Sequence, residues 1–96
     1  MAIESETKKQ KSEEIEMIVD VVTTIAKEIC DHPEAVQVKE IPAQNSSIIE
    51  VKVHKEDQGK MIGKQGRTAD AIRTIIYAAS FKYNKRFTLD IVVSKT

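Results

Sequence analysis

Hydrophobic residues recur along the chain with two different periods, and these periods predict its secondary structure. In the first third they recur at steps of three and four, as on one face of an α-helix; the residues are Ile15, Ile18, Val22, Ile25 and Ile29. The pattern predicts a helix of about 17 residues, with Ser12 as its N-cap. The helix should end near Asp31-His32-Pro33, because proline disfavours helical geometry in the residue before it.

Apolar and polar residues alternate in three later segments, as they do in half-buried strands. These segments are residues 35–40, 47–53 and 86–93. The turn-rich sequence PAQNS, residues 42–46, predicts a hairpin between the first two. A helical crossover joins the second to the third, which favours parallel pairing of those two strands.

Two helices are expected between the second and third strands. Residues 55–61 form a short one, and residues 67–81 form a long one that Tyr83-Asn84-Lys85 ends. The long helix should turn its apolar residues toward the core; they are Ile72, Ile75, Ile76 and Ala79. The order α-β-β-α-α-β predicts a two-layer α+β fold, in which helices cover one face of a three-stranded mixed sheet.

Length and composition fit one globular domain. With 96 residues, 41% hydrophobic and 31% charged, the chain can bury one core. Residues 1–12 are polar without periodicity, so we expect a flexible leader followed by one domain over 13–96. No apolar run approaches the roughly 20 residues of a membrane span, and the N-terminus lacks the features of a signal peptide. We therefore expect a cytoplasmic protein.

The net charge of zero hides a difference between the two halves. Residues 1–50 contain 5 Lys/Arg and 11 Asp/Glu, whereas residues 51–96 contain 10 Lys/Arg and 4 Asp/Glu. An anionic ligand is therefore expected to meet the second half.

The strongest chemical signal is the stretch GKMIGKQGR, from Gly59 to Arg67. Gly63 and Gly66 enclose two polar residues between two predicted helices, where glycine permits close approach and unusual backbone angles. Because Gly66 leads into a helix, free amides and the positive end of the helix dipole should face the loop, which favours a phosphate there. Basic residues add positive charge around the loop: Lys60, Lys64, Arg67 and Arg73.

Through the stretch GKMIGKQGRTADAIR, from Gly59 to Arg73, the sequence resembles the KH family, and in particular the short bacterial single-KH proteins of the KhpA type. The resemblance implies a type II KH domain, whose GXXG loop clamps about four nucleotides of single-stranded RNA beside an apolar groove. Two residues depart from the family's pattern: Ala69 is smaller than the usual aliphatic residue, and Asp70 places a negative charge near the loop. The RNA-binding residues expected on this basis are Lys60, Ile62, Gly63, Lys64, Gln65, Gly66, Arg67, Ile72 and Arg73, with Ile62 and Ile72 in the groove.

The resemblance also implies a cellular role. It implies a non-enzymatic RNA chaperone or post-transcriptional regulator, linked to cell shape, that pairs with a second copy or with a larger Jag-type RNA-binding protein.

The residues leave two alternatives open. One is a protein-interaction module that docks a partner on its acidic first helix, and the other is a protein for single-stranded DNA, which differs from RNA in the 2′-hydroxyl.

Nucleotide hydrolysis, metal binding and catalysis are not expected. A P-loop requires G-x-x-x-x-G-K-[ST], but only three residues separate Gly59 from Gly63. Cys30 is interpreted as a packing residue, and with His32 it falls short of a zinc site. His32 and His54 stand apart in sequence and are interpreted as surface residues, so no cofactor or metal is expected.

The remaining aromatic and basic residues carry little information about function. Tyr77, Phe81, Tyr83 and Phe87 are expected near core positions, which argues against an RNA-binding module with a stacking platform. Lys82, Lys85, Arg86 and Lys95 are interpreted as solvated surface.

Overall fold

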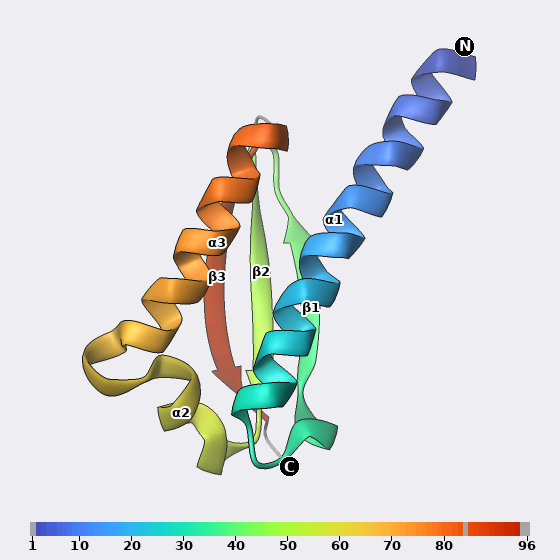
Figure 1. Cartoon of the computed structure of the whole chain (residues 1–96). Helices are drawn as coiled ribbons and strands as arrows, with labels where there is room; N and C mark the ends of the chain where they lie inside the picture. The colour runs from blue at the N-terminus through green and yellow to red at the C-terminus, as the bar shows by residue number, and fades with distance from the viewer. Residues whose placement is uncertain (1, 84, 95–96) are drawn as a thin grey trace.

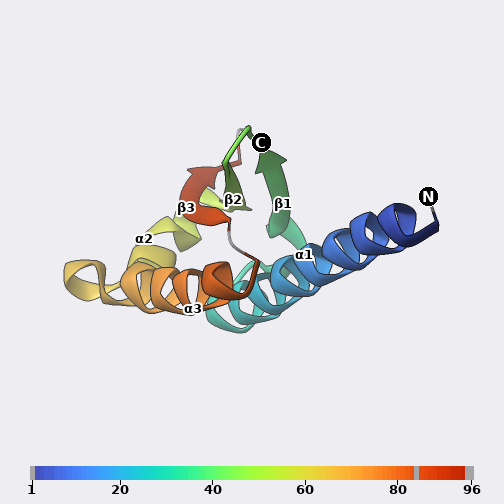
Figure 2. The ribbon, with the colours of Figure 1, turned by 90° about the horizontal axis from the view of Figure 1, so that it is seen from above.

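The structure, a computed structural model, places two long helices against one face of a three-stranded sheet (Figure 1). It describes the backbone of residues 2–83 and 85–94 and the side chains of residues 16–83 and 85–94. Viewed from above, α1 and α3 form one layer and the sheet forms the other (Figure 2). The main elements are α1 (Ala2–Ile29), β1 (Gln37–Pro42), β2 (Ser46–Val53), α2 (Gln58–Ile62), α3 (Arg67–Tyr83) and β3 (Arg86–Val93). The predicted α+β fold and its element order are confirmed.

Strand β2 is the centre of the sheet. It pairs antiparallel with β1, where Ile41 lies opposite Ile48, and parallel with β3, where Ile49 lies opposite Leu89. The predicted hairpin and parallel crossover are therefore confirmed. Every second side chain of β2 is fully buried against the helices, in the series Ser47, Ile49, Val51 and Val53.

The hydrophobic core lies between the sheet and the helices. Helix α3 contributes Ile72 and Ile76, which are four residues apart and so share one face. Ile75, expected to face inward, is 48% exposed. It lies at the margin of that face and turns away from the sheet, so this expectation is wrong. The other core residues include Ile18, Val22 and Ala26 of α1 and Met61 of α2.

Helix α1 starts eleven residues earlier than the sequence pattern predicts, at residue 2 instead of residue 13. It begins at Ala2 rather than after Ser12, because residues 2–12 contain no glycine or proline to interrupt it. The flexibility of residues 1–12 stays a prediction.

Three residues of the sequence analysis lie outside the described residues: Met1, Asn84 of the expected exit turn and Lys95. Within the described part of the chain, no helix has the length and hydrophobicity to cross a membrane.

A buried carboxylate joins the end of α1 to the segment before α2. Asp57 lies in the short turn η2 (Lys55–Asp57), is 0% exposed, and accepts hydrogen bonds from the backbone amides of Asp31 at 3.0 Å and His32 at 2.9 Å. Burial alone would raise the pKa of Asp57, but these two hydrogen bonds and the nearby charges of His32 and Lys60 outweigh it and lower the pKa. The ionised carboxylate therefore holds the two segments together.

We expect Asp57→Asn to destabilise the protein, because the side-chain nitrogen of asparagine cannot accept a hydrogen bond and one backbone amide loses its partner. Since the pKa of Asp57 in the folded protein lies below its ordinary value of 3.8, its contribution is fully present above that value. The contribution is lost as the pH falls through the lowered pKa. Urea unfolding should therefore separate parent and variant at neutral pH and bring them together in acid.

The control is Asp90→Asn, which removes an exposed carboxylate from β3. This variant should unfold at the same urea concentration as the parent. Equal destabilisation by the two substitutions would contradict the role given to Asp57.

Candidate nucleic-acid interface

The loop between α2 and α3 is a tight turn with unusual backbone angles. Gly63 has φ 80° and ψ 168°, and Gln65 and Gly66 have φ values of 58° and 76°. The amide of Gly66 donates to the carbonyl oxygen of Gly63 at 3.0 Å and closes the turn. Lys64 and Gln65 are exposed at its tip.

The two glycines of this loop are needed for different reasons. A β-carbon at Gly63 would lie 2.6 Å from the backbone nitrogen of Thr68 and 2.7 Å from its Cβ. The backbone angles of Gly63 also lie in a region that is open almost only to glycine. A β-carbon at Gly66 would meet nothing within 4 Å, so only the positive φ limits that position. Gly63 is what lets the loop lie against the start of α3.

Two of the four basic residues expected around the loop already have acidic partners. Lys60 forms an ion pair with Asp31 at the end of α1, and this interaction raises the pKa of Lys60. Arg73 pairs with Asp70 at 3.0 Å on the surface of α3. Both side chains of the second pair are more than half exposed, so a phosphate can compete for Arg73.

The other two basic residues are less engaged. Among the described residues, the Arg67 side chain forms one hydrogen bond, which it donates to the side-chain oxygen of Gln65 at the long distance of 3.4 Å. Lys64 is exposed and has no hydrogen-bond or ion-pair partner among the described side chains. The tip of the loop therefore presents the most available positive charge of the predicted set.

A groove of about 480 Å³ lies between α3 and β3 and starts one helical turn after Gly66. Because β3 is an edge strand, backbone groups on its outer side are not used by the sheet. Both walls carry cations, Arg73 from α3 and Arg86 from β3. The remaining lining residues are Asp70, Thr74, Ile76 and Tyr77 of α3, and Phe87, Thr88 and Leu89 of β3.

The two isoleucines expected in an apolar groove lie in different environments. Ile62 is 40% exposed at the end of α2, next to the loop. Ile72 is 2% exposed and packs in the core, and the groove is lined instead by Ile76, one turn later. A contact between either side chain and RNA stays a prediction.

The β3 side of the groove and the exposed aromatic rings were not apparent from the sequence. Arg86, expected on the solvated surface, lines the groove. The core position expected for Tyr77 and Phe81 is wrong, because they are 62% and 71% exposed, whereas Phe87 is buried. The helical period could have predicted the exposure of both rings. Each ring follows a core isoleucine of α3 by five residues, and five residues of an α-helix rotate a side chain about 140° away from the core face. The two rings pack edge to face with centroids 4.9 Å apart.

Comparison with known proteins identifies one family. The model of the family described as KhpA/KhpB, KH domain, matches residues 19–91. An RNA-binding protein KhpA from Caldanaerobacter subterraneus subsp. tengcongensis is 53% identical over 73 residues, which cover 76% of this chain and 97% of the relative. An RNA-binding protein KhpA from Clostridium acetobutylicum is 55% identical over 69 residues, which cover 72% of this chain and 92% of the relative.

A solved structure shows the same fold at lower similarity. The crystal structure of Aquifex aeolicus Era bound to GDP·AlF4− matches with a TM-score of 0.54 and 19% sequence identity. The match covers 80% of this chain and 30% of the Era chain. At this identity the likeness concerns the fold alone.

The contacts of the two glycines predict unequal effects of substitution. Gly63→Ala should be strongly destabilising or displace the loop, because the new methyl group meets the backbone of Thr68. Gly66→Ala should cost only about 1–2 kcal/mol, the strain of a positive φ for a residue with a β-carbon. Urea unfolding of both variants measures the difference. A larger loss of unfolding free energy for Gly66→Ala than for Gly63→Ala would show that the loop has a different conformation.

Proposed function

Since this chain belongs to the KhpA/KhpB family of KH domains, we propose that it binds single-stranded RNA through the loop from Gly63 to Gly66 and the groove between α3 and β3. One observation carries the proposal: an exposed, glycine-bounded turn, whose Lys64 has no partner among the described side chains, adjoins a groove of about 480 Å³. The proposed function is binding rather than catalysis.

The loop suits the phosphate backbone of the ligand. Its compact turn leaves room for a strand to approach the main chain, and the positive end of the α3 dipole lies directly after Gly66. Lys64 supplies a charge that no acidic side chain in the described residues neutralises. Lys60, by contrast, must give up its ion pair with Asp31 before it can contact RNA.

The groove suits the bases. Ile76, Phe87 and Leu89 line it with apolar surface. The hydroxyl groups of Thr74 and Thr88, and the free edge of β3, provide partners for the polar edges of bases. The exposed ring of Tyr77 adds a surface on which a base can stack.

We propose that the domain acts as an RNA chaperone or post-transcriptional regulator together with a second RNA-binding unit. One KH domain grips only about four nucleotides, so useful affinity requires two linked units. A second, apolar groove of about 160 Å³ lies between α1 and α3. Its lining side chains Met17, Val21 and Ile75 are 65%, 49% and 48% exposed, which is typical of an interaction surface. We place the second unit, a further copy or a Jag-type protein, on this surface.

Replacing Lys64 and Gln65 together by aspartate should abolish RNA binding and leave the fold intact. Two carboxylates at the loop tip repel phosphate. Aspartate also tolerates the positive φ of position 65 better than most residues do. Fluorescence anisotropy with labelled single-stranded RNA at several salt concentrations measures binding, and circular dichroism with thermal melting measures folding. Lys64→Ala alone should lower the salt slope of log K by about 0.7 to 1.

Lys39→Ala is the matched control, because it removes an exposed lysine from β1, at the far edge of the sheet from β3. It should change neither affinity nor salt slope. A folded double-aspartate variant that binds RNA like the parent would overturn the proposal and favour a protein-interaction module. Equal affinity for DNA of the same sequence would show that the 2′-hydroxyl is not read.

Val21→Glu and Ile75→Glu should each disrupt self-association. Both side chains are exposed in the single chain, so the fold should tolerate the change, whereas a carboxylate buried between two units is costly. Sedimentation velocity at several protein concentrations should show dimers for the parent and monomers for the variants, with weaker RNA binding. Ala78→Glu, exposed on α3 outside the apolar groove, is the control. A parent that stays monomeric and binds RNA tightly would contradict the need for a second unit.

A further inference from the structure

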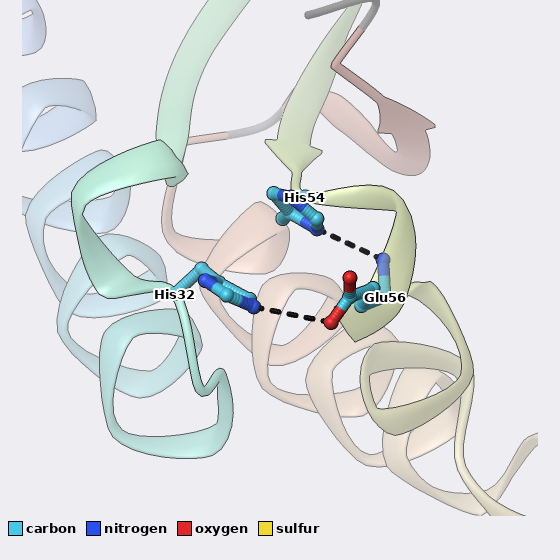
Figure 3. A group of neighbouring side chains, drawn as sticks. All are labelled: His32, His54 and Glu56. Carbon is cyan, nitrogen blue, oxygen red and sulfur yellow. Dashed lines mark hydrogen bonds and ion pairs between the residues drawn. The ribbon is translucent and has the colours of Figure 1, made fainter.

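The only two histidines of the chain meet on the surface near the end of α1, although 21 residues separate them in sequence. Their rings stack with centroids 4.1 Å apart and an interplanar angle of 24°. Glu56 lies against both (Figure 3): its Oε2 is 3.4 Å from Nε2 of His32, and its backbone amide donates to Nδ1 of His54 at 3.1 Å. One ligand atom of each residue lies within 4.8 Å of the other two.

We propose that His32, His54 and Glu56 bind a transition-metal ion of the Zn²⁺ type. Two imidazole nitrogens and one carboxylate oxygen form a ligand set that suits Zn²⁺, Co²⁺ and Ni²⁺, with water completing the coordination. Ligand atoms around a tetrahedral ion with bonds of about 2.1 Å are about 3.4 Å apart, so the most distant pair must approach by at most about 1.4 Å. One ring must also rotate out of the stack, because the lone pairs of stacked rings lie in nearly parallel planes. The two histidines are half-buried and Glu56 is exposed, which leaves the side chains room to rotate.

The hydrogen bonds of the two rings are compatible with metal binding. Nε2 of His32 donates to Oε2 of Glu56 at 3.4 Å, so an ion would displace the proton on Nε2 and bind both atoms. Oε1 of Glu34 lies 3.6 Å from Nδ1 of His32, where it favours the proton that the ring then keeps on Nδ1. A carboxylate behind a histidine ligand is the common arrangement around protein-bound metals. Nδ1 of His54 accepts a hydrogen bond and so carries no proton. A bound ion would coordinate this lone pair, and the exposed amide of Glu56 would donate its hydrogen bond to water instead.

The fold brings the ligands together before an ion arrives. The side chain of Asp57 accepts a hydrogen bond from the backbone amide of His32 at 2.9 Å. Because Asp57 directly follows Glu56 in sequence, this one hydrogen bond holds residue 32 next to residues 54–56. Nearby carboxylates of Glu34, Glu56 and Asp57 add negative charge that favours a cation. A bound ion would link the end of α1 to the turn before α2 and stabilise both.

Titration of the full chain with ZnCl2, followed by calorimetry, tests the proposal without RNA. We expect one ion per chain and a melting temperature that rises with ZnCl2. Because the chain has only two imidazoles, every histidine side-chain signal in NMR spectra reports on this site. Paramagnetic Co²⁺ should broaden these signals and the amide signals around residues 32 and 54–56 before any others.

His32→Asn, His54→Asn and Glu56→Gln should each weaken Zn²⁺ binding by at least about tenfold. The double histidine variant should not bind. Glu16→Gln, which removes an exposed carboxylate from α1, is the matched control and should bind like the parent. Half-saturation of the parent only above about 1 mM ZnCl2, or unchanged binding by the double histidine variant, would overturn the proposal. Broadening by Co²⁺ that begins elsewhere in the parent would overturn it too, and this outcome does not depend on any variant.

Discussion

The buried carboxylate of Asp57 is the contact on which the arrangement of this small fold depends. A buried charge is costly unless hydrogen bonds and opposite charge compensate it, and here the amides of Asp31 and His32 and the ammonium of Lys60 do so. The contact sets the end of α1 against the turn before α2. Gly63 follows six residues later, so the position of the loop that we assign to RNA is tied to the same carboxylate.

Periodicity was enough to predict the elements of the core and their order. Each buried side chain of β2 is two residues from the next, and the core residues Ile72 and Ile76 of α3 are four apart, as the two regular structures require. The parallel pairing of β2 with β3 follows from the handedness and length of the helical connection. The Gly63–Gly66 turn was predictable because only glycine suits the angles found at Gly63.

Features that depend on contacts between distant segments were not predictable in this way. The buried Asp57 lies in the polar sequence HKED, which resembles an exposed turn, and its partners are 25 and 26 residues away. The ion pair between Lys60 and Asp31 also joins separate segments, so the charge pattern overstated the free positive charge near the loop. The start of α1 was missed because a polar sequence without glycine or proline can extend an existing helix without any apolar period.

Helix α3 connects the two surfaces to which we assign binding. Tyr77 and Ile75 are two residues apart, and they line the groove beside β3 and the apolar groove beside α1, respectively. Ile76, between them, is buried and lines both. Because a packed helix moves as a rigid element, a unit docked against α1 and α3 must hold a fixed orientation relative to the RNA groove. Two units docked in the way we propose would present their grooves in a fixed geometry, and this would raise the effective concentration of the second groove for an RNA strand that can span both.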